Sequence, residues 1–160
     1  MKKSLNIGLV GYGTVGKGVV KILEKNSAIA LRKAGVKINV RSICDLYPID
    51  KPKLYVKNFM NIIKDPEIDI VVELIGGYEP ARTVITEALK NGKSVVTANK
   101  AALAKYWDEI FSLAQENKQM VYFEASSPLS SSSISSYSPI RSSCNAIRRS
   151  GVMGIRSNWV

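Results

Sequence analysis

The sequence predicts an α/β domain in which helices cover a doubly wound parallel sheet. Short apolar runs typical of strands alternate with helical patterns through residues 1–126, and a glycine-rich turn follows the first run. Alternation of this kind produces parallel strands joined by right-handed crossovers. At 160 residues the chain is long enough for one such domain with its own hydrophobic core.

The first part of the pattern lies before residue 45. A strand over Leu5–Val10 leads into a helix whose predicted buried face holds Val15, Val19, Ile22 and Leu23. We expect this helix to be long and to end at Gly35, after a basic turn. A second strand over residues 36–44 ends immediately before Asp45.

The alternation continues after a loop that holds a short strand over residues 54–56 and a short helix over 58–63. A buried strand is expected over Ile68–Ile75, and a helix then runs from Pro80 to Asn91-Gly92. Its apolar positions are Ala81, Val84, Ile85, Ala88 and Leu89. Two more strands, Ser94–Thr97 and residues 120–124, flank a helix from about residue 100 whose apolar face holds Leu103, Tyr106, Trp107, Ile110 and Leu113.

The turn after the first strand has the spacing of a dinucleotide-binding turn. The stretch Ile7-Gly-Leu-Val-Gly-Tyr-Gly-Thr-Val-Gly-Lys-Gly18 lies between a strand and a helix, with the motif glycines at 11, 13 and 16. Gly11 permits the tight turn, Gly13 lets the backbone approach a pyrophosphate, and Gly16 lets the helix lie near the strand. The helix N-terminus then faces the phosphates. The motif predicts a Rossmann-type fold; the alternative is a glycine-rich turn that binds nothing.

Other strand ends offer further candidate contacts. Asp45 can accept hydrogen bonds from the ribose hydroxyls of an adenosine, or it merely starts the Asp-Leu-Tyr-Pro turn. Gly76 and Gly77 again allow a ligand to approach the backbone. Lys100 follows a strand's carboxyl end, where a cation can stabilise charge on a carbonyl oxygen or take part in proton transfer. The alternative is a solvated lysine at a helix start, which is an unfavourable place for a cation.

Composition argues against several functional classes. The chain has no histidine and two widely separated cysteines, which excludes histidine-based catalysis and predicts no metal site. The net charge of +10 comes from lysines and arginines that are dispersed and not interleaved with aromatic residues, so we expect no nucleic-acid partner. No apolar run reaches the ~18–20 residues that a membrane span requires. Without a signal peptide either, a soluble cytoplasmic protein is expected.

The character of the sequence changes after Ser126. Residues 127–160 are rich in serine, have no acidic side chain and show neither a helix nor a strand period. Such a segment cannot bury enough apolar surface to offset its ordering entropy. We expect the domain to occupy residues 1–126 and residues 127–160 to form a disordered or irregular tail. A frameshift and a genuine variant both account for so abrupt a change.

Three stretches together resemble the nucleotide-binding domain of homoserine dehydrogenase. They are Gly8–Gly16, Asp69-Ile-Val-Val-Glu-Leu-Ile-Gly-Gly77 and Gly92-Lys-Ser-Val-Val-Thr-Ala-Asn-Lys-Ala101. The first is shared with many dehydrogenases, whereas the other two are more specific. The resemblance, over roughly residues 4–126, implies an NAD(P)-dependent oxidoreductase of threonine and methionine biosynthesis. Such an enzyme interconverts L-homoserine and L-aspartate 4-semialdehyde by hydride transfer.

The resemblance also implies roles for individual residues. Tyr12, Gly13, Thr14 and Val15 resemble the pyrophosphate turn, and Ile75, Gly76 and Gly77 resemble the loop over the adenine-side ribose and the approach to the nicotinamide. Thr97 and Asn99 look like nicotinamide-side contacts, and Lys100 matches the lysine beside the reacting centre. The cofactor implied is NAD or NADP. Asp45 favours NAD because its carboxylate would repel a 2′-phosphate, unless Arg41 offsets it.

The family's substrate domain, which carries most of the homodimer interface, has no counterpart in the serine-rich segment. We therefore expect this chain to hold the cofactor-binding half and to be inactive on its small-molecule substrate alone. The alternatives are a non-catalytic dinucleotide-binding module and the cofactor domain of a related amino-acid dehydrogenase.

Overall fold

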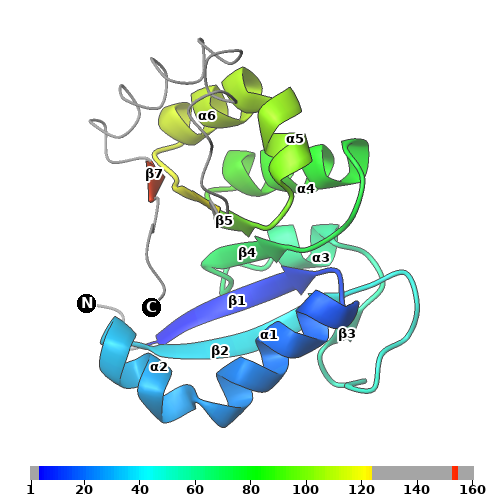
Figure 1. Cartoon of the computed structure of the whole chain (residues 1–160), viewed down its shortest axis with the longest axis vertical. Helices are drawn as coiled ribbons and strands as arrows, with labels where there is room; N and C mark the ends of the chain where they lie inside the picture. The colour runs from blue at the N-terminus through cyan, green and yellow to red at the C-terminus, as the bar shows by residue number, and fades with distance from the viewer. Residues whose placement is uncertain (1–3, 124–152, 155–160) are drawn as a thin grey trace, which may run out of the picture.

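Figure 1 shows the computed structural model of the chain, which describes residues 4–123 and 153–154. The strands form one seven-stranded sheet in the order β3-β2-β1-β4-β5-β6-β7, and every neighbouring pair is parallel. The first six follow the strand order of a Rossmann fold, so the predicted fold class is confirmed. The strands are β1 Ser4–Val10, β2 Lys37–Cys44, β3 Tyr55–Val56, β4 Ile70–Glu73, β5 Ser94–Thr97, β6 Val121–Phe123 and β7 Met153–Gly154.

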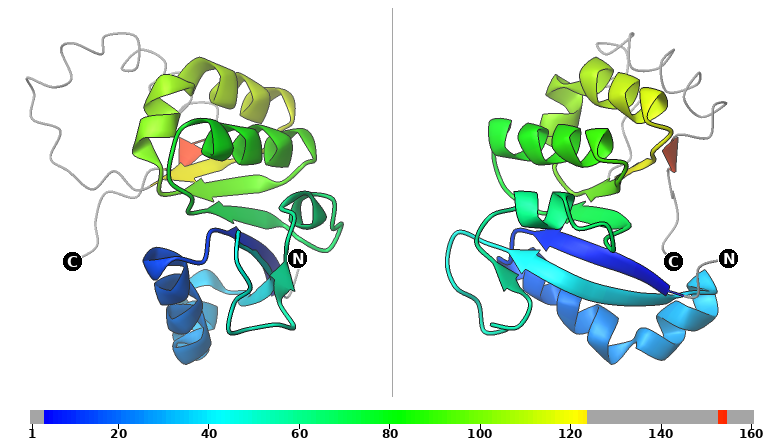
Figure 2. Two further views of the ribbon diagram at one scale, coloured as in Figure 1. Left: turned by 90° about the vertical axis from the view of Figure 1, so that its right-hand side faces the viewer. Right: turned by 180° about the vertical axis from the view of Figure 1, so that it is seen from behind.

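Helices lie on both faces of the sheet. Figure 2 shows α1 (Thr14–Lys25) and α2 (Ser27–Ala34) on one side of β1 and β2, with α3 (Met60–Ile63) on the other. The remaining helices, α4 (Glu79–Lys90), α5 (Lys100–Lys105) and α6 (Trp107–Glu116), share a core with α3. Because side chains alternate along a strand, neighbouring strand residues enter different cores.

That alternation is visible in the central strands. Leu9 and Val72 belong to the core beneath α1, whereas Val10 and Val71 belong to the core beneath α3, α4 and α6. The sheet is thus buried on both faces around β1 and β4, which explains why these strands are nearly continuous apolar runs.

The helix predicted after the buried strand Ile68–Ile75 agrees with the structure most closely. All five of its predicted apolar residues are buried in α4, and the helix ends at Asn91 and Gly92 as expected. Pro80 lies in its first turn, where the missing N–H of proline costs no hydrogen bond.

The prediction of one long helix between the first two strands is wrong. The helix ends at Asn26, whose φ of −111° and ψ of 25° are not helical, and α2 begins at the next residue. Asn26 makes no side-chain hydrogen bond to the first turn of α2. Gly35 closes α2 in the left-handed conformation, with φ of 72°, as the sequence predicts.

The predicted buried face of the first helix is also partly wrong. Val15 and Ile22 are 58% and 59% exposed, and the buried positions are Gly16 and Val20. The helix approaches the strand through Gly16, where a side chain is absent. This close contact turns Val15 and Ile22 away from the core.

The helix predicted from residue 100 is interrupted as well. Tyr106, with φ of −116° and ψ of 28°, separates α5 from α6. The apolar face is nevertheless the expected one, with Leu103, Trp107 and Ile110 buried. The predicted boundary at residues 126 and 127 lies outside the described residues, as does the serine-rich segment apart from β7, which pairs with β6.

Candidate cofactor-binding site

The carboxyl ends of β1 and β4 meet where the strand order reverses, because β1 lies between β2 and β4. Open α/β sheets bind ligands in the crevice at such a point. Two cavities lie here, of about 550 Å³ and about 470 Å³. Ile75 and Gly76, in the loop after β4, line both cavities. The two spaces therefore lie on either side of one loop, as the two halves of an extended ligand require.

The glycine turn combines a tight bend with a close helix approach. Gly11 has a φ of +101°, and a Cβ there would lie 2.8 Å from the carbonyl oxygen of Leu74. A Cβ on Gly16 would lie 2.3 Å from the carbonyl oxygen of Gly11 and 3.3 Å from Cδ2 of Leu9. Gly13 is different, because no described heavy atom lies within 4 Å of the position its Cβ would take. The turn is thus closed at its first and last glycines and open at the middle one.

The N-terminus of α1 is suited to an anion. The first helical residue after Gly13 is Thr14, and the first turn holds no acidic residue and no side-chain cap. The N–H groups of this turn therefore have no intrahelical acceptor, and the positive end of the helix dipole is not neutralised by a local carboxylate.

Asp45 is brought to the same edge. Its Oδ2 accepts a hydrogen bond of 2.6 Å from the backbone N–H of Tyr12, and its Oδ1 accepts one of 3.3 Å from the N–H of Tyr47. It also lines the larger cavity together with Lys57. Asp45 thus begins a turn and borders the cavity at once. Arg41 does not fold back toward it, because its Nε lies 2.8 Å from Oδ2 of Asp65.

The smaller cavity lies between the loops after β4 and β5. Val15, Gly77, Asn99 and Lys100 line it, together with the shared residues Ile75 and Gly76. Lys100 is the exposed first residue of α5. Asn99 caps that helix, because its Oδ1 accepts from the N–H of Ala102 at 3.0 Å.

Five of the predicted contacts do not line either of these two cavities: Tyr12, Gly13, Thr14, Gly16 and Thr97. The Tyr12 side chain is buried in the core beneath the turn, and burial, with a hydrogen bond to Asp50, raises the pKa of its phenol. Thr97 is 2% exposed, and its hydroxyl bonds to the carboxylate of Glu73 below the cavity floor.

Glu73 is the part of this region that sequence reasoning missed. It is fully buried at the end of β4, and its Oε1 accepts from the N–H of Ile75 at 2.7 Å. Burial raises the pKa of its carboxyl, against the opposing effect of hydrogen bonds from Thr97 and Ile75. The available signal was an acidic residue inside an otherwise apolar strand.

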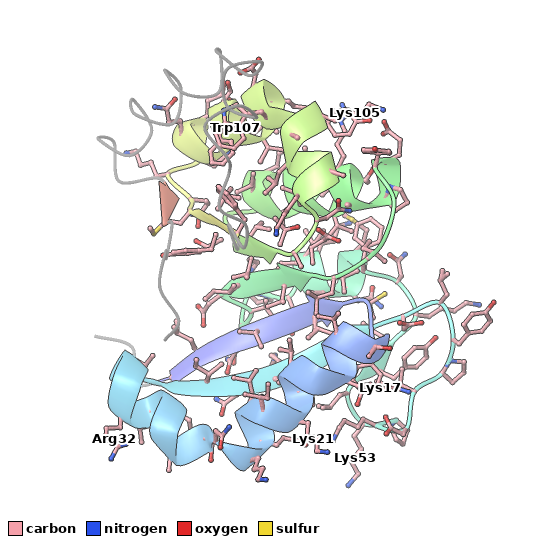
Figure 3. The ribbon with its side chains drawn as sticks, in the orientation of Figure 1. Lys17, Lys21, Arg32, Lys53, Lys105 and Trp107 are labelled. Atoms are coloured by element: carbon pink, nitrogen blue, oxygen red, sulfur yellow. The ribbon has the colours of Figure 1, made fainter. Side chains whose placement is uncertain are left out.

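Basic side chains are spread over the outer faces of α1 and α2. Figure 3 shows Lys17, Lys21 and Arg32 projecting outward from these helices, with Lys53 on the loop after β2; Arg32 lies at the end of the sheet away from the glycine turn. Lys17 lies nearest the glycine turn, with its Nζ 5.9 Å from the centre of the Tyr12 ring.

Neither a metal centre nor a membrane span is found in the described part of the chain. Within residues 4–123 and 153–154, no three His, Cys, Asp or Glu side chains are grouped so that they could hold a metal ion. None of the helices described here is both long and apolar enough to cross a membrane.

Comparison with known proteins gives one consistent family. Residues 11–124 match the family described as homoserine dehydrogenase, NAD binding domain. The chain is 40% identical over 128 residues to the homoserine dehydrogenase of Neisseria gonorrhoeae. That match covers 77% of this chain and 29% of the Neisseria protein. It is 36% identical over 156 residues to the Synechocystis homoserine dehydrogenase, covering 95% of this chain and 35% of that protein. The chain thus spans about a third of the length of the curated relatives it matches.

Solved structures agree. A homoserine dehydrogenase from Thiobacillus denitrificans is similar with a TM-score of 0.72 and 45% identity, over 77% of this chain and 30% of that one. A hyperthermophilic archaeal homoserine dehydrogenase in complex with NADPH is similar with a TM-score of 0.63 and 28% identity. That match covers 76% of this chain and 44% of the archaeal one.

Proposed function

Because the chain belongs to the homoserine dehydrogenase family, whose NAD-binding domain it contains, we propose that it binds NAD or NADP across the two cavities of the crevice. The observation that carries the proposal is the shared loop: Ile75 and Gly76 lie between two cavities of about 550 and 470 Å³ at the strand-order reversal. The adenosine half would occupy the cavity beside Asp45, and the nicotinamide half the cavity beside Lys100.

The residues present fit a dinucleotide. The open space at Gly13 admits a pyrophosphate against the backbone, and the uncapped first turn of α1 supplies N–H groups to it. Asp45 would accept hydrogen bonds from the ribose hydroxyls while retaining its contact with the N–H of Tyr12. Val15, exposed on α1, would pack against the ligand in the smaller cavity, which Asn99 also lines.

We further propose that the protein to which this domain belongs interconverts L-homoserine and L-aspartate 4-semialdehyde. When bound, the cofactor accepts or donates the hydride. Lys100 would place its ammonium group beside the carbonyl oxygen of the semialdehyde, where it stabilises the negative charge that develops as the carbonyl is reduced. Homodimeric assembly and a cytoplasmic location are carried over from the family as parts of this proposal.

Calorimetric titration of the full chain with NADH and NADPH tests the binding proposal. Gly13→Val should abolish measurable binding, because the branched side chain would fill the space that the pyrophosphate needs. Gly18→Val is the matched control: its Cβ would also have no described neighbour within 4 Å, but it lies farther along α1. If Gly13→Val bound NADH and NADPH as tightly as Gly18→Val and the wild type do, Gly13 would not lie against the pyrophosphate. A wild-type chain that binds neither nucleotide would refute the proposal.

A further inference from the structure

Glu73 is a costly group that the proposed cofactor contacts leave unexplained. Its side chain is fully buried, and both of its described hydrogen-bond partners are uncharged donors. A carboxyl group in such a place loses its hydration without gaining a cation, whereas an apolar side chain of similar volume would fill the same space at lower cost. The contacts of Glu73 indicate what the carboxyl group does.

These contacts form a closed ring between two loops. Glu73 and Thr97 are paired across β4 and β5, and their side chains are hydrogen-bonded to each other. Glu73 accepts from the N–H of Ile75 at 2.7 Å, and Thr97 Oγ1 accepts from the N–H of Asn99 at 2.9 Å. The Asn99 amide completes the ring, donating to the carbonyl oxygens of Gly77 at 2.7 Å and Ile75 at 3.2 Å.

The ring lies directly beneath the smaller cavity. Ile75, Gly77 and Asn99 line that cavity, whereas Glu73 and Thr97 line neither cavity. The spacing of the two loops is therefore set from below by side chains that do not face the ligand space. The larger cavity depends on other elements, namely the ends of β1 and β2 and the first turns of α4, and it shares only the loop after β4 with the ring.

We propose that Glu73 and Thr97 are positioning residues that hold the loops after β4 and β5 at the separation the nicotinamide half of the cofactor needs. This inference rests on the proposed function, because it takes the smaller cavity as the nicotinamide side. It predicts a selective effect. Breaking the ring weakens binding of the whole dinucleotide and leaves binding of its adenosine part nearly unchanged.

The test compares the dissociation constants of NADH and ADP, measured by calorimetry on the full chain. Thr97→Val keeps the side-chain volume but leaves Asn99 N–H without its acceptor, and Glu73→Leu removes the carboxyl group from the centre of the ring. Each variant should raise the dissociation constant of NADH by about tenfold, as expected for the loss of one buried hydrogen bond. ADP affinity should change by less than about threefold, within the range of a lost weak contact.

Two conservative variants and one control define the role. Glu73→Gln should retain NADH affinity, because its amide can still accept from Ile75 N–H and donate to the Thr97 hydroxyl; Thr97→Ser should retain it as well. Thr86→Val removes another largely buried threonine hydroxyl, one bonded to the carbonyl of Thr83, and should leave both affinities unchanged. Thermal unfolding of every variant reports the purely structural cost.

The outcomes separate the possible roles. A parallel loss of NADH and ADP affinity would mean that the ring supports the whole fold, and would overturn the inference. A loss of NADH affinity in Thr97→Val without a loss in Glu73→Leu would mean that Thr97 contacts the cofactor directly, and would also overturn the inference. If the wild type binds both ligands, and the ratio of the NADH and ADP dissociation constants is the same in every variant, the positioning role is refuted and the proposed function is not. A wild-type chain that binds neither ligand refutes the proposed function and, with it, the positioning role.

Discussion

Two glycines in α1 should respond in opposite directions to the same substitution. Gly→Ala inside a helix normally stabilises a protein by about 0.5–1 kcal/mol, because alanine loses less backbone entropy on folding. Gly18→Ala should show this gain, since no described atom lies within 4 Å of the new Cβ. Gly16→Ala should instead destabilise, because its Cβ would lie 2.3 Å from the carbonyl oxygen of Gly11.

The size of the Gly16 effect follows from what surrounds the clash. The predicted contact is about 1 Å closer than an ordinary one, and the atom in the way belongs to the backbone. Gly11 cannot retreat easily, because it already packs against the Leu74 carbonyl and has a φ of +101°. We therefore expect the upper end of the overpacking range, about 3 kcal/mol. For a domain of this size, that loss lowers Tm by roughly 10 °C.

Urea unfolding followed by far-ultraviolet circular dichroism measures both variants against the wild type. The expected result is a raised midpoint for Gly18→Ala and a lowered one for Gly16→Ala, with equal m-values. If Gly16→Ala were as stable as Gly18→Ala, the close approach of α1 to the turn would be wrong, and with it the reason for a glycine at position 16.

Two further predictions concern acidic residues. Burial raises the native-state pKa of Glu73, so its contribution to stability is full below the unfolded-state pKa of about 4.3 and is lost as the pH rises through the native pKa. As the pH rises through this range, the unfolding free energy of the wild type should therefore fall relative to that of Glu73→Gln. A difference between the two proteins that does not change with pH would show that burial does not raise the pKa of Glu73. Asp45→Ala should raise the affinity for NADP relative to NAD by about fivefold or more, because it removes a charge facing the 2′-phosphate. Competition binding measures the ratio, and an unchanged ratio would show that Asp45 does not reach the ribose.

Much of the fold was predictable because the apolar periods are strong where elements are buried. In α4, the positions of Ala81, Val84 and Leu89 match one helix face, and Pro80 and Gly92 mark its ends, so every local signal agrees. The two helix breaks were not predictable in this way. Neither Asn26 nor Tyr106 is next to a glycine or a proline, the residues that most strongly signal the end of a helix.

The site divides along similar lines. The glycine turn could be predicted because backbone conformation and close approach demand glycine itself. The contacts of Glu73 could not be predicted, because periodicity assigns each strand position to a buried face and carries no information on which side chains meet across the sheet. Its partner Thr97 is 24 residues away, and the two become neighbours through the pairing of β4 with β5. The same pairing explains why Thr97 lies under the cavity instead of in it.

The central place of β1 has a consequence for synthesis of the protein on the ribosome. β1 can pair with β2 once Cys44 has emerged, but its other edge gains a partner only when β4 is complete at Glu73, about thirty residues later. At ~5–20 residues per second, that edge stays unpaired for roughly 2–6 s. An unpaired apolar strand is a template for pairing with another chain. The strand that leads into the glycine turn is therefore also open to aggregation while the chain is being made, and slower translation between residues 44 and 73 lengthens that exposure.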